Sequence, residues 1–331
     1  MSLRSLLWPL SLLYAAAICV RNGYYDRRRT AVHRAALPVI SVGNLTVGGT
    51  GKTPLVVELV RRLRSWGHRP AIVTRGYKGR PGQPADEVLE YRAAVPEVPV
   101  VANADRVAGA AQACADGADS VVLDDGFQHR RLARDLDVVL IDALDPWGGG
   151  WLLPAGRLRE PLSSLGRADV LVITRANQVP PPTLGEITHR LRRWAARQPV
   201  VLANVEPAGL SDRTGQPLEL QELHRRPVLG VCGLGNPRTF QYLLALHADR
   251  PDVLVFADHA RYGRRAIRRI VERARRGRAE WVVTTRKDWV KLASVWPSEA
   301  PPLIRLDARL VLGEGVEELD RRLRQVMETR R

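Results

Sequence analysis

The segment Ser41-Val-Gly-Asn-Leu-Thr-Val-Gly-Gly-Thr-Gly-Lys-Thr-Pro54 sets the architecture of this chain. It overlaps the end of an apolar run, Leu37 to Val42, and precedes an amphipathic helical pattern from Leu55 to Trp66. A glycine-rich turn between a buried strand and a helix is typical of a P-loop, whose backbone N–H groups converge on phosphate oxygens. The N-terminus of the following helix adds a favourable dipole. The sequence therefore predicts a nucleoside triphosphate site.

The residues of this loop have distinct predicted roles. Lys52 would reach the outer phosphates, and the Thr53 hydroxyl would complete the coordination of Mg2+. Only four of the 51 basic residues are lysines, so a lysine here is not the default basic residue of the chain. Thr46 stands where the usual pattern begins with glycine, and a plain glycine turn before a helix is the alternative. The predicted nucleotide-binding set is Thr46, Val47, Gly48, Gly49, Thr50, Gly51, Lys52 and Thr53.

Composition indicates a folded protein of two domains. The chain has 331 residues, of which 45% are hydrophobic and 26% charged, and this length is enough for two cores of ordinary size. Its three cysteines are far apart, which favours neither disulfides nor a zinc site and suits a cytosolic protein. The net charge of +16 fits nucleic acid, an anionic membrane or a phosphorylated substrate as a partner. Arginine placed simply on solvated surfaces is the alternative.

Residues 1–30 predict a helix that lies in a membrane interface. The uncharged run from Ser5 to Val20 is shorter than the roughly 20 residues needed to span a bilayer, and it contains Pro9. Arginines follow it directly, as expected at an anionic cytoplasmic leaflet. We therefore expect a monotopic anchor that does not cross the membrane. A cleaved signal peptide and a helix packed wholly on the protein core are the alternatives. One helical stripe would hold Leu6, Leu7, Leu10, Leu13, Tyr14 and Ala17.

Apolar runs alternate with helical patterns along the rest of the chain, which predicts an α/β fold with a parallel sheet. Residues 31–204 would form a P-loop domain. A turn signal, Ser211 to Gly215, lies between short apolar stretches and predicts a two-stranded linker over residues 205–222. A second, smaller α/β domain would occupy residues 223–331, beginning at the apolar run Pro227 to Cys232.

A second chemical motif, Val121-Val-Leu-Asp-Asp-Gly-Phe-Gln-His129, ends an apolar strand in acids. An acidic strand end downstream of a P-loop is the arrangement that holds Mg2+ beside the phosphates. Asp124 and Asp125 would supply the hard oxygen ligands that Mg2+ prefers, and adjacent carboxylates are costly there without a cation. Gln128 and His129 would touch metal-bound water or substrate. An acidic turn and locally satisfied loop residues are the alternatives.

Several motifs in order along the chain resemble the tetraacyldisaccharide 4'-kinase family of the lipid A pathway. The sequence departs from the family pattern at Ala85-Asp86-Glu87-Val88, where Gly-Asp-Glu-Pro is usual, and at Arg286, where glutamate is usual. The matching motifs are Ser41–Pro54, Asp124–Asp142, Leu152–Pro161, Gly233–Pro237 with Phe240, Phe256–His259 and Thr285–Lys291.

The resemblance implies transfer of the γ-phosphate of ATP to the 4'-hydroxyl of a tetraacyldisaccharide 1-phosphate lipid, with ATP and Mg2+ as cofactors. In the family an aspartate and a histidine are paired for proton transfer, and here they would be Asp86 and His259. Lys52 would be catalytic, the metal ligands would be Thr53, Asp124, Asp125 and Gln128, and substrate contacts would come from Asn44, Arg75, His129 and Arg157. The enzyme would work at the cytoplasmic face of the bacterial inner membrane on anionic lipid, as a monomer and without nucleic acid.

Two other classes of protein use a P-loop. A GTP-driven metal-insertion protein would need a guanine-reading Asn-Lys-x-Asp segment, which Thr174-Arg-Ala-Asn177 matches poorly, and a cluster of metal-binding cysteines. A nucleic-acid-binding NTPase would need aromatic platforms, whereas Phe, Trp and Tyr make up only 5% of residues. Consumption of ATP that depends on a lipid acceptor would separate these classes from a lipid kinase.

Overall fold

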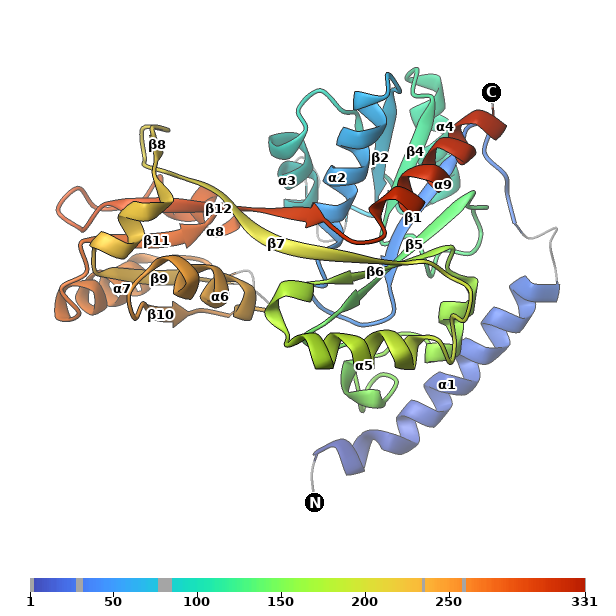
Figure 1. Ribbon diagram of the computed structural model, residues 1–331, viewed down its shortest axis with the longest axis horizontal. Helices are drawn as coiled ribbons and strands as arrows, with labels where there is room; N and C mark the ends of the chain where they lie inside the picture. The colour runs from blue at the N-terminus through green and yellow to red at the C-terminus, as the bar shows by residue number, and fades with distance from the viewer. Residues whose placement is uncertain (1–2, 28–31, 77–84, 234–235, 258–259, 331) are drawn as a thin grey trace. The chain divides into compact units, whose positions relative to one another are not determined.

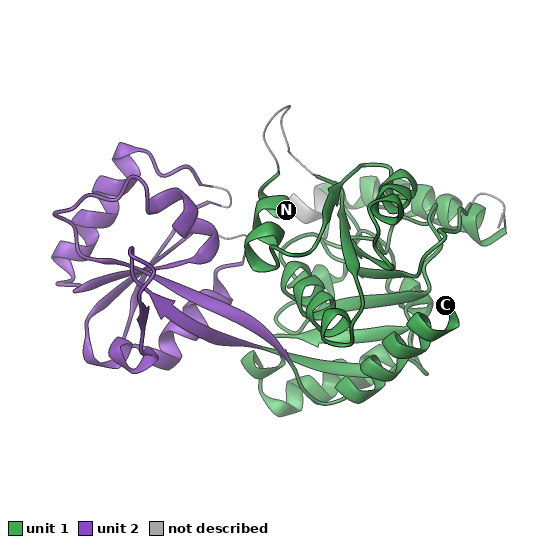
Figure 2. Ribbon diagram, turned by 90° about the horizontal axis from the view of Figure 1, so that it is seen from above, with its two compact units in different colours: residues 1–204, 312–331 green, residues 205–311 purple. Residues whose placement is uncertain are grey.

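The chain forms two compact units in the computed structural model, which describes residues 3–27, 32–76, 85–233, 236–257 and 260–330. Unit 1 contains residues 1–204 and 312–331, and unit 2 contains residues 205–311 (Figure 2). The chain therefore passes from unit 1 to unit 2 once and returns once.

Unit 1 is built on a parallel sheet, as the alternating pattern predicts (Figure 1). Its strand order is β7-β6-β5-β1-β4-β2-β3, and every pairing in this run is parallel. Strands β1, β2, β4, β5 and β6 are buried along their whole length, which explains why each appears in the sequence as a continuous apolar run. The strands are β1 (Val39–Asn44), β2 (Pro70–Thr74), β3 (Val100–Ala102), β4 (Ser120–Asp124), β5 (Leu136–Asp142), β6 (Val170–Thr174) and β7 (Val200–Ser211).

Helices cover the sheet of unit 1. Helix α4 packs against Val121 and Leu123 of β4, and α5 packs against Val139 and Ile141 of β5. Helix α5 ends at Leu191, and the Arg192 side chain donates to the carbonyl of Gln198 in the turn that follows. The helices are α2 (Lys52–Ser65), α3 (Asp86–Ala94), α4 (Arg106–Ala115), α5 (Pro181–Leu191) and α9 (Val316–Thr329), with 3-10 turns at Gly148–Gly150, Leu162–Arg167 and Ala176–Gln178.

The C-terminal helix α9 belongs to unit 1, and not to the second domain in which the sequence placed it. Its buried side chains are Leu319, Leu323 and Met327. Charged contacts hold both of its ends, since Asp320 pairs with Arg62 of α2 at 2.7 Å and Arg330 pairs with Asp135 at 2.7 Å. The helix contacts β5 (Leu136–Asp142), which lies far earlier in the chain, so its domain could not be assigned from neighbouring sequence.

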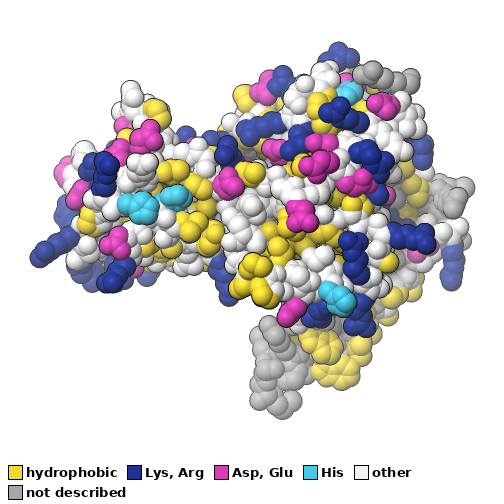
Figure 3. All heavy atoms as spheres, viewed as in Figure 1, with side chains coloured by type: hydrophobic (Ala, Val, Ile, Leu, Met, Phe, Trp, Pro, Cys, Tyr) yellow, Lys and Arg dark blue, Asp and Glu magenta, His cyan; other side chains and the backbone are white. Residues whose placement is uncertain are grey.

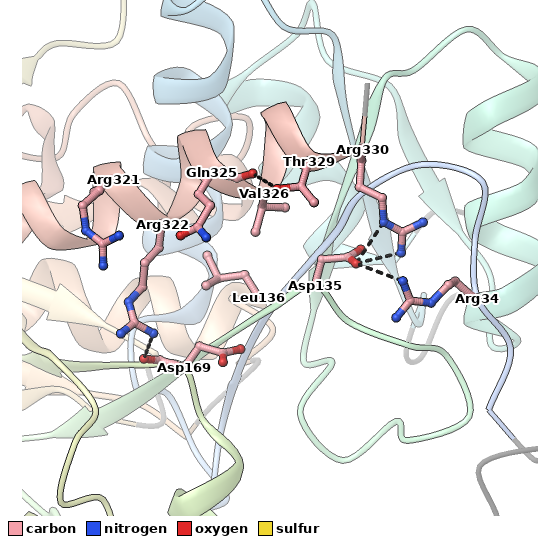
Figure 4. Close-up of a pocket in the computed structure, with 10 residues that line it drawn as sticks. All are labelled: Arg34, Asp135, Leu136, Asp169, Arg321, Arg322, Gln325, Val326, Thr329 and Arg330. Carbon is pink, nitrogen blue, oxygen red and sulfur yellow. Dashed lines mark hydrogen bonds and ion pairs between the residues drawn. The ribbon is translucent and has the colours of Figure 1, made fainter.

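A pocket of about 450 Å³ lies between α9 and the sheet (Figure 4). It lies at the amino ends of the strands, because Asp135 and Leu136 lie at the start of β5 and Asp169 directly precedes β6. The arginines in Figure 4 are engaged: Arg330 and Arg34 pair with Asp135, and Arg322 donates to the Asp169 carbonyl. The pocket is thus a packing junction of α9.

Helix α1 (Leu3–Arg27) lies along unit 1 and is held mainly by polar contacts. The Ser11 hydroxyl donates to the Leu152 carbonyl, and the Tyr14 hydroxyl donates to the Arg159 carbonyl. Arg21 pairs with Glu160 at 2.6 Å. Among the side chains of α1 that the structure describes, only Ser11 and Ile18 are buried, which does not fit a helix packed wholly in the core.

Much of the described apolar surface of α1 faces solvent. Leu13 and Val20 are 70% and 75% exposed, and apolar side chains gather at the N-terminal part of the helix (Figure 3). None of the helices within the described residues is long and apolar enough to cross a bilayer. Other exposed large apolar side chains of the helix are Trp8, Leu10, Leu12 and Tyr24.

The strands of unit 2 run in the order β10-β9-β11-β12, and each pairing in this run is parallel. Residues 205–222, predicted as a linker, form an antiparallel hairpin of β7 with β8 and a following 3-10 turn. They belong to unit 2, because Leu210 and Leu223 are part of its core. The elements are β8 (Pro217–Leu218), β9 (Val228–Cys232), β10 (Asp252–Val255), β11 (Trp281–Thr285), β12 (Leu303–Leu312), α6 (Arg238–His247), α7 (Arg264–Arg276) and α8 (Arg286–Leu292), with a 3-10 turn at Leu220–Arg225.

Two of the sequence motifs meet in unit 2 at the buried carboxylate of Asp288. It accepts hydrogen bonds from the Gly233 backbone N–H, the Tyr262 hydroxyl and the Thr285 hydroxyl, each at 2.9 Å. Burial, and then the Asp288 charge, raise the pKa of the Tyr262 hydroxyl far above its usual range. The motif around Asp288 therefore holds loops of unit 2 together.

Candidate phosphate-binding site

The predicted phosphate loop lies at the carboxyl ends of the strands of unit 1, between β1 and α2. Helix α2 begins at Lys52, and Gly51 before it has a left-handed φ of 93°. No side-chain hydrogen bond caps this helix end, so its first N–H groups are left for another acceptor, as an anion site requires. Gly48 also has a left-handed φ, of 117°, and Gly48 and Gly49 are exposed. The loop has the form that the sequence predicts.

Asn44 holds Lys52 inside this loop. The Lys52 ammonium donates to Asn44 Oδ1 at 3.1 Å, while Asn44 Nδ2 donates to the Thr46 carbonyl at 2.6 Å. Gln128 Nε2 donates to the Asn44 carbonyl at 2.9 Å. Asn44, predicted as a substrate contact, is fully buried. In this structure it orders the phosphate loop, and the hydrogen bond from Gln128 fixes the Asn44 backbone.

The end of β6 contacts the loop through two residues that sequence reasoning missed. The Thr174 hydroxyl donates to the Thr50 carbonyl at 2.9 Å. Arg175 donates to the Gly49 carbonyl at 2.7 Å and pairs with Asp142 at 2.5 Å. In the sequence this segment is only a poor match to a guanine-reading motif, and in a chain with 47 arginines nothing distinguishes Arg175 from a solvated one.

Arg157, a predicted substrate contact, lies on the other side of the loop. Its guanidinium donates to the Val47 carbonyl at 2.8 Å and pairs with Asp145 at 2.8 Å. Its backbone carbonyl accepts from the Val47 N–H at 2.8 Å. The loop is thus held from both sides by arginines.

The two adjacent carboxylates at the end of β4 have different surroundings. Asp125 pairs with Arg159 at 2.7 Å and with Lys52 at 3.4 Å. Burial opposes its ionisation, but the Lys52 and Arg159 charges outweigh burial and lower its pKa. Asp124 is 4% exposed, and its Oδ1 accepts no hydrogen bond from the described residues. Burial raises the pKa of Asp124 to about 6 despite the opposing Lys52 charge, and the Glu87 carboxylate adds to the rise.

Helix α3 adds two side chains to the site that sequence reasoning missed. The buried Tyr91 ring places its hydroxyl beside Asp124 and Thr53, and burial followed by the Asp124 charge raises its pKa well above the usual value. Glu87 accepts a hydrogen bond from the Thr74 hydroxyl at 3.1 Å. The signal for Glu87 was present, since it follows Asp86 in the motif quoted above.

A close approach of backbones brings the second motif to the loop. A Cβ on Gly43 of β1 would come within 2.5 Å of the Phe127 Cβ, so only glycine fits there. Phe127 is fully buried and fixes the turn that contains Asp125 and Gln128. The phosphate loop and the acidic motif, which are far apart in the sequence, therefore contact each other through Gly43 and Phe127.

The remaining predicted residues are less closely joined to this site. Burial, and then the neighbouring Arg106 charge, lower the pKa of His129, which favours its neutral form. Arg75, after β2, and Asp86, at the start of α3, are exposed. His259 lies outside the described residues and belongs to unit 2, whereas Asp86 belongs to unit 1. Their predicted pairing stays a prediction.

The donor set fits a magnesium ion bound together with phosphates. Asp124 offers a buried carboxylate oxygen without a hydrogen bond from the described residues, and Thr53 lies at the start of α2 close to Tyr91. Mg2+ bound with a nucleotide uses only one or two protein carboxylates, and water and phosphate oxygens complete its shell. Within the described residues there is no group of three or more His, Cys, Asp or Glu side chains that could hold a metal ion by themselves. The arrangement suits phosphoryl transfer from a nucleotide.

Comparison with known proteins points to one family. A family model described as tetraacyldisaccharide-1-P 4'-kinase matches residues 3–328. A tetraacyldisaccharide 4'-kinase of Syntrophus aciditrophicus is 37% identical, over 87% of this chain and 84% of the relative. One from Anaeromyxobacter sp. strain K is 36% identical, over 92% of this chain and 86% of the relative. The crystal structure of LpxK from Aquifex aeolicus in complex with ATP has a TM-score of 0.74 and 29% identity, covering 98% of this chain and all of that one.

Proposed function

Because the chain belongs to the tetraacyldisaccharide-1-P 4'-kinase family, we propose that it transfers the γ-phosphate of ATP to the 4'-hydroxyl of a tetraacyldisaccharide 1-phosphate lipid. The observation that carries this proposal is the loop Thr46–Thr53, which presents an uncapped helix end and Lys52 beside the acids of β4. The complex of the Aquifex aeolicus relative with ATP supports the choice of nucleotide.

The loop and Lys52 would stabilise the transferring phosphoryl group. Phosphoryl transfer passes through a loose transition state, so positioning and charge stabilisation supply most of the acceleration. Backbone N–H groups at the start of α2 would bind phosphate oxygens, and Lys52 would neutralise charge that develops on them. Asn44 and Asp125 hold the Lys52 ammonium at the mouth of the loop before the nucleotide binds.

Asp124 and Thr53 would hold Mg2+, which neutralises charge on the outer phosphates when it is bound. Asp125 suits this role less well in the observed state, because Arg159 and Lys52 already pair with it. Gln128 acts through Asn44. Glu87 adds a third carboxylate beside Asp124.

The acceptor hydroxyl must lose a proton, and we assign this step to Asp86 and His259. A carboxylate that orients an imidazole is a common general-base arrangement. His259 falls in a motif that matches the family, and the segment around Asp86 keeps the Asp-Glu of the usual Gly-Asp-Glu-Pro, which supports the assignment. Arg75, His129 and Arg157 are proposed to contact the disaccharide or its phosphate.

Helix α1 would bring the enzyme to its membrane-embedded substrate at the cytoplasmic face of the inner membrane. The exposed apolar side chains of Trp8, Leu13 and Val20 support burial in the interface. Basic residues attract anionic lipid by about 1 kcal/mol each near the surface, and Arg21 and Arg27 lie at the C-terminal end of α1. We propose that the enzyme acts there as a monomer and without nucleic acid.

A transfer assay tests the function. Purified protein is incubated with Mg2+, γ-labelled ATP and tetraacyldisaccharide 1-phosphate in mixed micelles, and the lipid is separated and its label measured. The proposal predicts label in the 4'-phosphorylated lipid, with Asp124→Asn strongly reduced and Glu58→Gln, at the half-buried Glu58–Arg62 pair of α2, as the control. The proposal would be contradicted if the label were released only as free phosphate, or if ATP consumption were stimulated by DNA or RNA and not by lipid.

A further inference from the structure

The phosphate loop presents its N–H groups because other residues hold its carbonyls. A peptide unit is planar and trans, so its C=O and N–H point in opposite directions. Fixing the carbonyl of one loop residue therefore aims the N–H of the next residue the opposite way. Side chains from outside the loop fix several of its carbonyls.

Two successive carbonyls of the loop are held from the end of β6. The Thr174 hydroxyl donates to the Thr50 carbonyl at 2.9 Å, and Arg175 donates to the Gly49 carbonyl at 2.7 Å. By the planarity of the peptide, these bonds turn the N–H groups of Gly51 and Thr50 away from β6. Arg157 holds the Val47 carbonyl at 2.8 Å in the same way and so turns the Gly48 N–H.

Arg175 is built into this position at a cost. Its backbone is left-handed, with φ 58° and ψ 32°, a conformation that is unfavourable for a residue with a side chain. Its side chain is buried, and its charge is balanced by the equally buried Asp142, which also accepts from the Leu144 N–H. A buried ion pair is weak evidence for stability but fixes geometry.

We propose that Thr174 and Arg175 are positioning residues for phosphate binding. They fix the carbonyls of Thr50 and Gly49, and thereby aim the N–H groups of Gly51 and Thr50 at the nucleotide. This inference rests on the proposed function, since it concerns the same loop. It also gives the segment Thr174–Asn177 a role other than reading a purine base.

The test replaces one hydroxyl in each unit. Thr174→Val removes the bond to the loop and keeps the shape of the side chain. Thr284→Val is the matched control, because Thr284 is equally buried and donates to the Val231 carbonyl at 2.8 Å, in unit 2. Thr174→Ser restores the hydroxyl. ATP binding is measured by titration calorimetry and turnover by the lipid transfer assay.

Thr174→Val is expected to weaken ATP binding and raise the KM for ATP by about tenfold, equivalent to about 1.4 kcal/mol. Thr174→Ser should recover most of the affinity, and Thr284→Val should leave it unchanged even where it lowers Tm. Arg175→Lys keeps a charge for Asp142 but loses the forked donor, so a loss of affinity is also expected.

The outcomes separate the two claims. Wild-type affinity for ATP in Thr174→Val, or equal losses in Thr174→Val and Thr284→Val, would overturn the positioning role. Failure of the wild-type protein itself to bind ATP would instead overturn the proposed function. If Arg175→Lys does not fold, Thr174→Val and its serine rescue still decide the question.

Discussion

Replacing Glu160 by Gln should loosen α1 from unit 1. The Glu160 carboxylate is fully buried and pairs with Arg21 of α1 and with Arg167, both at 2.6 Å. Removing one partner of a wholly buried pair costs about 3–5 kcal/mol. Here the guanidinium side chains of Arg21 and Arg167 are 36% and 21% exposed and keep part of their hydration. We therefore expect a loss of about 3 kcal/mol, near the value of two weakened charge-assisted bonds.

Asp26→Asn is the matched control on the same helix. Asp26 pairs with Arg130 at the same 2.6 Å, but its side chain is 60% exposed, so its loss should cost less than about 1 kcal/mol. Urea unfolding gives the free energy, and hydrogen exchange of the α1 amides shows whether the loss is local. Salt should abolish the Asp26 effect and spare the Glu160 effect. Equal losses in the two variants would refute the claim that burial decides the strength of these pairs.

Three further predictions concern the site and the membrane. Lys52→Ala should lower kcat/KM for ATP by orders of magnitude in the transfer assay, and near-normal turnover would reject the site. Because the folded pKa of Asp124 is raised from 3.8 to about 6, its contribution to stability is present below pH 3.8 and lost as the pH rises through 6. With a chelator present, Asp124→Asn should therefore gain about 3 kcal/mol over wild type in urea unfolding between pH 3.5 and pH 8, and a constant difference would contradict this. Leu13→Glu combined with Val20→Glu should abolish binding to anionic vesicles in flotation assays with an unchanged Tm; retained binding would refute the α1 anchor.

The elements that the sequence predicts well are those whose signal is local. Each buried strand of unit 1 is a continuous apolar run, and helix α2 lies where the amphipathic pattern from Leu55 to Trp66 predicts it. Helix α3 was missed because only Val88 and Tyr91 of its nine residues are buried, too few for a helical period to show. The position of α9 was missed because its partners are far away in the chain.

The supporting side chains of the site could not be predicted for a different reason. Carbonyl groups and long guanidinium side chains meet only when the fold is complete, so Arg159 and Arg175 look in the sequence like the other arginines. Arg157 was expected to contact substrate, and its bond to the Val47 carbonyl could not be predicted. Tyr91 reaches Asp124 from a helix that the sequence did not show. The P-loop itself was predictable, because its glycines and Lys52 are local requirements of phosphate binding.

Asp124 and Asp125 look equivalent in the sequence, yet their neighbours give them opposite properties. Lys52 and Arg159 keep Asp125 ionised, and in return Asp125 holds Lys52 at the mouth of the loop. Asp124 is buried among Tyr91, Glu87 and Asp125, which makes its ionised form costly in the protein alone. A divalent cation would reverse that cost, since it favours the ionised carboxylate. The burial of Asp124 destabilises the metal-free fold above pH 6, and the same burial would strengthen the binding of the cation by Asp124. A loss of stability at this residue is an expected feature of a functional site.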